Sequence, residues 1–403
     1  MPITYLISPS EKGILENAGD RPPLGLLYMA KELEKHNHPV KVFDLNHDTK
    51  KDLFDSIERD SPEMIGVSCL TSPMVKRSKR LIRELRDRAS SRLVVGGYHT
   101  SVLPKDFIRT SVDNIVSGEG EYVIECLVDG VNDKKIVKGR PVDLEKLGKP
   151  SRHLLEMSRY GMEMDGMRTG TMLTSRGCPN ECIFCGNRRD KVRFSSLDTI
   201  SEELDELRSL GYDAVYIMDD VFTLNKNRAV EISKMLQDRG LRFRCTTRAN
   251  CLDEDLVYEL SQNGCHLASI GVESGSDEML ERIGKNQTRE DITKAVRMLS
   301  SNGIKSKGFF ILGLPGETHK TILQTIEYSQ QLKREGLSSA DFYAMTPFPG
   351  TRVWENPDKF GIEIVDRDYS NYLQTEDPVC ETEELVTYQI RDYINTARSL
   401  WKK

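Results

Sequence analysis

Residues 171–185 read TMLTSRGCPNECIFC, a short apolar stretch followed by three cysteines at positions 178, 182 and 185. Cysteine thiolates are the usual ligands of iron–sulfur clusters, and a cubane of four irons normally takes one thiolate per iron. A Cys-x3-Cys-x2-Cys loop therefore leaves one iron with an open coordination position, which a metal site needs in order to carry out chemistry. The spacing predicts one [4Fe–4S] cluster bound by Cys178, Cys182 and Cys185.

Two other interpretations of the three thiols stay open on sequence grounds. Three cysteines and a histidine can bind zinc, but the sequence has no histidine between His153 and His266. The thiols can also be unrelated buried side chains, which is the ordinary interpretation of the other cysteines. Those lie scattered along the chain at Cys69, Cys126, Cys245, Cys251, Cys265 and Cys380. An odd total of nine suits a reducing compartment and metal chemistry better than a disulfide framework.

The length and composition are those of a soluble globular protein. A chain of 403 residues allows two or three domains, and 38% hydrophobic with 30% charged residues is an ordinary balance. No apolar run approaches the roughly 20 residues of a membrane span, and residues 3–8 read as a first strand rather than a signal peptide. We therefore expect a cytoplasmic protein without a membrane span. A net charge of −6 gives no electrostatic reason to expect a nucleic-acid partner.

The first 130 residues alternate short apolar runs with helical patterns, which predicts a doubly wound α/β domain around a parallel sheet. The strands are expected at residues 3–8, 40–44, 64–68, 93–95 and 114–116. Ligands bind at the carboxyl ends of strands in such sheets. Glycine and small polar residues cluster at those ends, in residues 68–73, 96–101 and 118–121.

A second βα series begins at Thr171, after a segment with little periodicity. Residues 131–168 are rich in lysine, glycine and proline and read as a linker with a short helix near residues 152–159. The strands of the second series are expected at residues 171–175, 214–218, 241–247, 267–272, 308–312 and 342–346. Six successive βα units predict an incomplete parallel barrel with its site at the carboxyl ends of the strands.

The stretch Thr174-Ser175-Arg176-Gly177-Cys178-Pro179, with its three-cysteine spacing, resembles the radical SAM superfamily. The core of that family is similarly a partial barrel of six βα units, with the cluster loop after the first strand. The resemblance implies that the open iron chelates S-adenosylmethionine (SAM) and passes it one electron, producing a 5'-deoxyadenosyl radical. It also implies an electron donor of the flavodoxin or ferredoxin type.

Further motifs that resemble the family follow successive strands of the second series. They are Met218-Asp219-Asp220, Thr247-Arg248, Gly271-Val272-Glu273-Ser274-Gly275 and Gly313-Leu314-Pro315-Gly316-Glu317. An arginine at a strand end can bind a carboxylate in a bidentate way, and adjacent carboxylates are costly without a cation or donors beside them. The resemblance implies SAM contacts at Phe184, Asp219, Asp220, Arg248, Glu273, Leu312 and Gly313.

The N-terminal half resembles the cobalamin-binding class of radical SAM enzymes. The resemblance implies cobalamin contacts at Pro23, Leu24, Gly25, Ser68, Leu70, Thr71, Gly96, Gly97, His99, Gly118 and Glu119. The wider cobalamin-binding fold often supplies an axial histidine from Asp-x-His-x-x-Gly, and that motif is absent here. Asp44-Leu45-Asn46-His47 has the wrong spacing, so the lower ligand of cobalt is in doubt more than the cofactor itself.

The resemblance implies a division into four parts and a specific reaction. The parts are a cobalamin-binding-like domain (1–130), a linker (131–168), a radical SAM partial barrel (169–351) and a C-terminal region for substrate or packing (352–403). The implied enzyme is a methyltransferase that uses SAM, a [4Fe–4S] cluster and cobalamin to methylate an unactivated carbon. Its substrate is a small molecule or biosynthetic intermediate.

Three alternatives to methylation stay open. Some relatives use the same cofactors for rearrangement, cyclisation or oxidation without methyl transfer. A non-catalytic cobalamin-binding sensor or scaffold is a different class, and retention of the cysteines together with Glu273 argues against it. A methylthiotransferase needs a second three-cysteine cluster, and the first half offers only Cys69 and Cys126.

Overall fold

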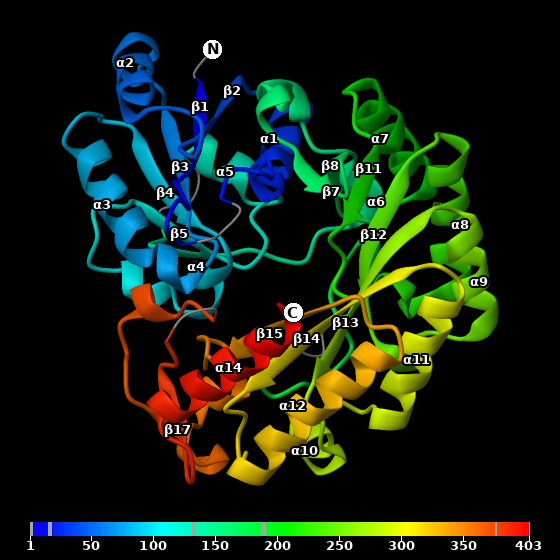
Figure 1. Cartoon of the computed structure of the whole chain (residues 1–403). Coiled ribbons are helices and arrows are strands. Elements are labelled where there is room, and N and C mark those ends of the chain that lie inside the picture. The colour runs from blue at the N-terminus through cyan, green and yellow to red at the C-terminus, as the bar shows by residue number, and fades with distance from the viewer. Residues whose placement is uncertain (1–2, 15–17, 131–133, 187–190, 375–376, 403) are drawn as a thin grey trace. The chain divides into compact units, whose positions relative to one another are not determined.

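The chain forms two compact units, Met1–Glu163 and Met164–Lys403 (Figure 1). The computed structural model describes residues 3–14, 18–130, 134–186, 191–374 and 377–402.

The first unit contains a six-stranded parallel sheet with the order β2-β1-β3-β4-β5-β6. Its strands are β1 (Thr4–Ser8), β2 (Val40–Asp44), β3 (Met64–Ser68), β4 (Arg92–Gly96), β5 (Asn114–Ser117) and β6 (Ile136–Lys138). Its helices are α1 (Leu24–Lys35), α2 (Lys50–Asp60), α3 (Val75–Arg86), α4 (Tyr98–Val102), α5 (Ile124–Val128) and α6 (Leu144–Leu147). The chain starts inside the sheet and moves outward in both directions, which is the doubly wound arrangement.

The segment that the sequence predicts as a linker contributes to this first unit. Strand β6 pairs with β5, Ser151 N donates to Leu27 O at 3.2 Å, and the Arg152 side chain is almost fully buried. Two 3-10 turns, Arg152–Leu154 and Met157–Arg159, stand where a short helix is expected. The sequence does not reveal β6, because an edge strand of three residues needs little apolar surface and this one stands among lysines. The four-part division of the chain stays a prediction.

The second unit is built on a sheet with the order β15-β14-β13-β12-β11-β8-β7. Six of its strands run parallel: β8 (Met167–Met172), β11 (Ala214–Ile217), β12 (Arg242–Thr247), β13 (Cys265–Glu273), β14 (Lys305–Leu312) and β15 (Ser339–Ala344). The seventh is β7 (Met162–Met164). This is the expected open series of six βα units, and the predicted fold class is confirmed.

Helices cover one face of this second sheet (Figure 1). They are α7 (Leu197–Ser209), α8 (Lys226–Asp238), α9 (Glu254–Gln262), α10 (Asp277–Arg282), α11 (Arg289–Ser301) and α12 (His319–Arg334). The strand residues beneath them are apolar and fully buried, for example Phe243 and Cys245 in β12. Alternate residues on the opposite face, such as Arg244, are only half-buried, because successive side chains of a strand point to opposite faces.

The C-terminal residues pack on the last strand of the second sheet. Helix α14 (Thr387–Trp401) lies along β15 (Figure 1), and Arg398 Nη2 donates to Phe342 O at 2.6 Å. Its apolar stripe of Ile390, Ile394 and Ala397 is buried, as the helical spacing predicts. The remaining elements are α13 (Arg352–Glu355) and the antiparallel pair of β16 (Ile362–Ile364) and β17 (Cys380–Thr382). Among the described helices, none combines the length and apolar character that crossing a bilayer requires.

Candidate functional site

The cysteine loop starts at a two-stranded ribbon beside the carboxyl end of β8. Strand β8 ends at Met172, three residues before the ribbon strand β9 (Ser175–Arg176), which pairs with β10 (Arg193–Phe194). The sequence predicts a single strand over residues 171–175; the observed break follows from the buried Asp219. That carboxylate accepts from the backbone N–H and hydroxyl groups of both Thr174 and Ser175, at 2.5–3.1 Å.

Asp219 therefore anchors the start of the loop. Burial raises the pKa of Asp219 above its ordinary value, while the hydrogen bonds from Ser175 and Thr174 act in the opposite direction. Both carboxylate oxygens are engaged by these donors, which gives Asp219 a structural role that sequence reasoning missed. The predicted contact of Asp219 with SAM stays a prediction, as does that of its half-buried neighbour Asp220.

None of the three loop thiols forms a disulfide, and two of them lie near N–H donors. Cys182 is buried, and Cys178 and Cys185 are half-buried. Asn180 Nδ2 lies 3.3 Å from the Cys178 sulfur, and Arg248 Nη1 lies 3.7 Å from the Cys182 sulfur. Hydrogen bonds from neutral and charged donors stabilise a thiolate relative to a thiol. Three thiols of one loop that lie outside disulfides, two of them with such donors, fit a [4Fe–4S] cluster.

A segment far along the chain, residues 283–287 after α10, holds the loop from the other side. Ile183 N donates to Ile283 O at 3.1 Å, and the Cys182 sulfur lies 3.8 Å from Gly284 O. Arg248 bridges the two, because its guanidinium contacts both Cys182 and the carbonyl oxygen of Lys285. A side chain at position 284 would press on the loop backbone, since a Cβ there would lie 3.3 Å from Glu181 O.

The predicted SAM ligand Glu273 forms a buried ion pair with Lys285 of this segment. Lys285 Nζ lies 2.6 Å from Glu273 Oε1, and the two side chains are 7% and 8% exposed. Gly271 makes room for the pair, because a Cβ at that position would lie 2.3 Å from Glu273 Oε1 and 2.5 Å from Lys285 Nζ. Glu273 also has a φ of +66°, which a non-glycine residue rarely adopts and which is typical of constrained functional positions.

The turn after β14 is fixed by the buried carboxyl group of Glu317. Its Oε2 accepts from Gly313 N at 2.6 Å and from Leu314 N at 3.1 Å. Burial raises the pKa of Glu317 to about 8, against the effect of those two donors. Gly313 has a φ of +84°, and a Cβ there would lie 2.9 Å from Ile390 of α14. The backbone of the predicted adenine contacts, Leu312 and Gly313, is thus held in one conformation.

Apart from Phe184, the predicted SAM residues lie at or just beyond the carboxyl ends of parallel strands. Direct contacts join the cysteine loop to Arg248, and through Lys285 to Glu273. Phe184 is half-buried within the loop itself. Lys285 was not predicted as part of this site, because a lysine after a short charged helix gives no sequence signal.

The predicted cobalamin residues of the first unit lie at the carboxyl ends of β3, β4 and β5 and at the start of α1. Ser68 and Gly96 end β3 and β4, and Thr71 caps the 3-10 turn Ser72–Met74. Gly97 has a φ of +116°, and a Cβ there would lie 2.6 Å from Cys69 O, so no other residue fits. Leu70 is 53% exposed at this edge, a large apolar side chain in contact with solvent. Small residues with an exposed leucine fit a large, partly apolar cofactor.

The other predicted cobalamin positions are occupied as follows. Pro23 occupies the N-cap position of α1, Leu24 is buried, and Gly25 is exposed with open space where a side chain would be. Gly118 has a φ of +104°, and a Cβ there would lie 2.9 Å from Gly139 O. Glu119 Oε2 accepts from Val142 N at 2.6 Å, so this carboxylate ties the strand end to the following segment.

His99, a predicted cobalamin contact, is a core residue in the structure. It is fully buried, with Nδ1 at 3.0 Å from Ser72 Oγ and Nε2 at 3.0 Å from Asp106 Oδ2. Both ring nitrogens are occupied, so the imidazole holds two turns together. The predicted contact of His99 with cobalamin stays a prediction.

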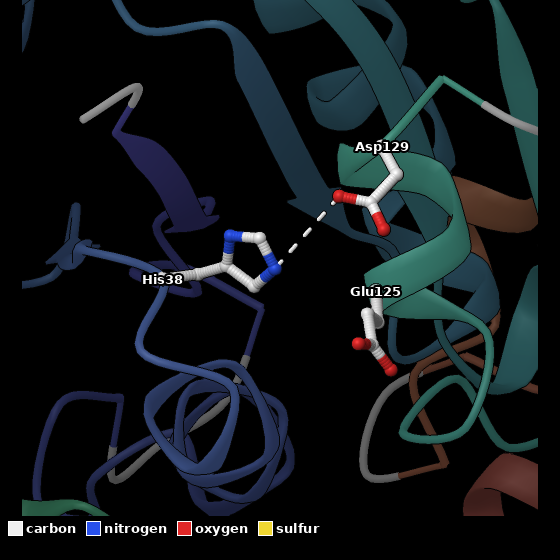
Figure 2. A group of neighbouring side chains, drawn as sticks. All are labelled: His38, Glu125 and Asp129. Carbon is white, nitrogen blue, oxygen red and sulfur yellow. Dashed lines mark ion pairs between the residues drawn. The ribbon is translucent and has the colours of Figure 1, made fainter.

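The other histidines of the first unit also contact protein groups. His47 Nε2 lies 2.7 Å from Gly19 O, and His153 Nε2 lies 2.8 Å from Glu34 Oε1. His36 pairs with Glu125 at 2.9 Å. Figure 2 shows His38, which points toward Asp129 at 3.9 Å, with Glu125 one turn before Asp129 on α5. His38, Glu125 and Asp129 could hold a metal ion, but the structure already places His38 near Asp129 and Glu125 near His36.

The fold and the thiol loop together define a radical SAM enzyme with an additional α/β unit, and comparison with known proteins agrees. The radical SAM superfamily matches residues 172–329, and the B12 binding domain matches residues 13–128. A protein of Pyrococcus horikoshii named an uncharacterized methyltransferase is 31% identical, over 98% of this chain and 91% of its own length. The chain belongs to the cobalamin-binding radical SAM family.

A further relative and a solved structure extend the comparison. An anaerobic magnesium-protoporphyrin IX monomethyl ester cyclase of Rubrivivax gelatinosus is 23% identical over 93% of this chain and 73% of its own length. The radical SAM methyltransferase TsrM of Kitasatospora setae, solved with cobalamin and a [4Fe–4S] cluster, has the same fold. Its TM-score is 0.77 at 18% identity, covering 99% of this chain and 89% of that one. The predictions of family and of cofactors, a [4Fe–4S] cluster, SAM and cobalamin, are confirmed.

Proposed function

We propose that this protein methylates an unactivated carbon of a small molecule, with Cys178, Cys182 and Cys185 as the cluster ligands. The observation that carries the proposal is the combination, in one chain, of a three-cysteine loop outside disulfides with a unit that matches the B12 binding domain. When bound, the cluster supplies one electron to SAM and cobalamin carries the methyl group. The protein's own part is placement and exclusion of water, since the cofactors carry the difficult chemistry.

Each site residue has a defined part in that placement. Asp219 fixes the start of the loop, and Arg248 holds Cys182 against the 283–287 segment. We infer that the Glu273 carboxylate, held by Lys285, and the Gly313 turn, held by Glu317, orient SAM through its ribose and adenine. A flavodoxin- or ferredoxin-type donor is the proposed electron source.

Methylation and a radical rearrangement differ in their stoichiometry, which gives the test. A methylase consumes one SAM as methyl donor and a second as radical source. S-adenosylhomocysteine and 5'-deoxyadenosine should therefore form in about equal amounts in the presence of the substrate, and methyl-deuterated SAM should add three deuterons to the product. The measurement is mass spectrometry of both nucleosides and of the product.

One alternative reaction is supported by a specific similarity. The cyclase of Rubrivivax gelatinosus is named for ring formation, not methyl transfer. A product formed with 5'-deoxyadenosine alone, without label, would move the assignment to cyclisation, rearrangement or oxidation. The cluster and SAM residues would keep their proposed roles, because both reactions begin with the same cleavage of SAM.

A second prediction concerns the lower face of cobalt. We expect cobalamin to bind the first unit without a protein histidine on the metal, because all five histidines of that unit contact other groups and Leu70 at the strand edge has no ligand atom. His47→Ala should leave the visible spectrum of the bound cobalamin unchanged after gel filtration. A changed spectrum would restore an axial histidine, and loss of cobalamin from the wild type would refute binding.

A further inference from the structure

The face of the second sheet opposite the helices carries a set of polar and aromatic side chains. In β12 the residues Phe243, Cys245 and Thr247 are buried beneath the helices, whereas Arg244 and Thr246 face the other way and are half-buried. The strand register places the equivalent residues of the neighbouring strands on the same face. We call this set the Arg244 face: Tyr216, Arg244, Ser269, Lys307, Asp341 and Tyr343.

Two cations and one anion make up the charges of the Arg244 face. Lys307 Nζ lies 2.6 Å from Asp341 Oδ2, and the Tyr343 hydroxyl donates to the same carboxylate at 2.9 Å. Lys307 thereby neutralises the negative charge of Asp341. Arg244 has no carboxylate partner among the described residues, so no side chain of the face neutralises its positive charge.

The Arg244 side chain is held in place with part of its hydrogen-bonding capacity unused. Its guanidinium lies over the Tyr216 ring, 4.2 Å from the ring centre, and this stacking leaves the edge of the guanidinium available. The Arg244 Nε is buried without a hydrogen-bond partner in the described structure. A buried N–H without an acceptor is costly, and an oxyanion at this point would remove that cost.

Ser269 gives independent evidence on the neighbouring strand. Its side chain is fully buried, and its hydroxyl likewise has no hydrogen-bond partner in the part of the chain that the structure describes. Ser269 stands opposite Thr246 of β12 and Lys307 of β14. Such unpaired buried hydroxyls in a native fold call for an explanation, and a bound polar molecule is one.

Aromatic rings adjoin the charged part of the face. Tyr343 lies 6.1 Å from Phe309, ring centre to ring centre, and Phe309 stands opposite Asp341. Burial raises the pKa of Tyr343, and the nearby Asp341 carboxylate and Tyr216 hydroxyl add to that effect. The face therefore offers both an apolar contact and an excess positive charge.

We propose that the Arg244 face binds the substrate, and that this substrate carries a carboxylate or phosphate group which Arg244 holds. Guanidinium groups bind both oxyanions with paired N–H donors. Arg244 lies three residues before the end of β12, so about 10 Å separate it from the edge that carries Arg248 and the cysteine loop. A small molecule anchored at Arg244 can place a carbon at that edge. The inference rests on the proposed function and adds the substrate class to it.

The test uses the reconstituted holoenzyme with methyl-deuterated SAM, a chemical reductant and a metabolite extract of cells that encode the chain. Anion exchange separates the extract into anionic and non-anionic fractions before the reaction. The deuteromethyl product should arise from the anionic fraction. Arg244→Met should lower its yield at least tenfold, and Arg244→Lys less. Cleavage of SAM to 5'-deoxyadenosine without extract should not change, because Arg244 is not part of the SAM site.

The matched control is Arg242→Met. Arg242 is an exposed arginine at the start of β12 and points to the same face of the sheet as Arg244. The product yield of this variant should equal that of the wild type. A labelled product from the non-anionic fraction overturns the inference and leaves the proposed function intact. So does an unchanged yield in Arg244→Met. Absence of labelled product from every fraction, with SAM still cleaved, overturns methyl transfer itself.

Discussion

Replacement of Cys178, Cys182 and Cys185 by alanine removes the iron–sulfur cluster and, with it, all reductive cleavage of SAM. This is the largest effect we expect from any substitution, because no other described cysteines lie on one loop with chelating spacing. Anaerobic reconstitution followed by iron and sulfide analysis, visible absorption and quantification of 5'-deoxyadenosine measures the loss. The fold should survive, since Asp219 and the 283–287 segment hold the loop through groups outside the sulfur atoms.

The matched control replaces three cysteines outside the loop: Cys69, Cys126 and Cys380. Cys69 and Cys380 are buried, and burial raises the pKa of each to about 12, so neither is a ready thiolate. This control variant should keep its iron, its sulfide and its SAM cleavage. If the loop variant still produces 5'-deoxyadenosine, the assignment of the cluster ligands is wrong.

Much of the fold follows from local patterns. Strands β2 and β3 have the predicted bounds. Each is a mainly apolar run that ends at a polar residue, Asp44 or Ser68. The site residues could be placed together because parallel strands of one sheet end at the same edge. Three residues on different strands illustrate this: Glu273 ends β13, and Arg248 and Gly313 directly follow β12 and β14.

The missed features depend on contacts between residues distant in sequence. The sequence places Asp219 beside the site but gives no sign that Thr174 and Ser175 occupy its oxygens, 45 and 44 residues away. The sequence likewise gives no sign that His99 contacts Asp106, seven residues further on. Lys285 is the clearest case, since only the fold brings it to Glu273.

Lys285→Met should destabilise the second unit more than any other charge substitution discussed. It would leave the Glu273 carboxylate buried without its cation, and breaking a buried pair by removing one partner costs about 3–5 kcal/mol. Urea unfolding of the reconstituted holoprotein, followed through the visible absorption of the cluster, measures the change. That signal is suited to the purpose because Lys285 O accepts from Arg248, which contacts Cys182.

The double variant Lys285→Met/Glu273→Gln decides whether the pair itself is responsible. Removal of both charges of a buried pair is often close to neutral, so the double variant should regain much of the stability lost in the single variant.

Lys226→Met is the matched control, because Lys226 pairs with Asp253 where both side chains are about half exposed. Such a surface pair contributes less than about 1 kcal/mol. A double variant no more stable than Lys285→Met would mean that Lys285 acts through packing. The double variant should still cleave SAM poorly even where its stability is restored. Its cluster loop remains, but it lacks the Glu273 carboxylate that is proposed to meet the SAM ribose.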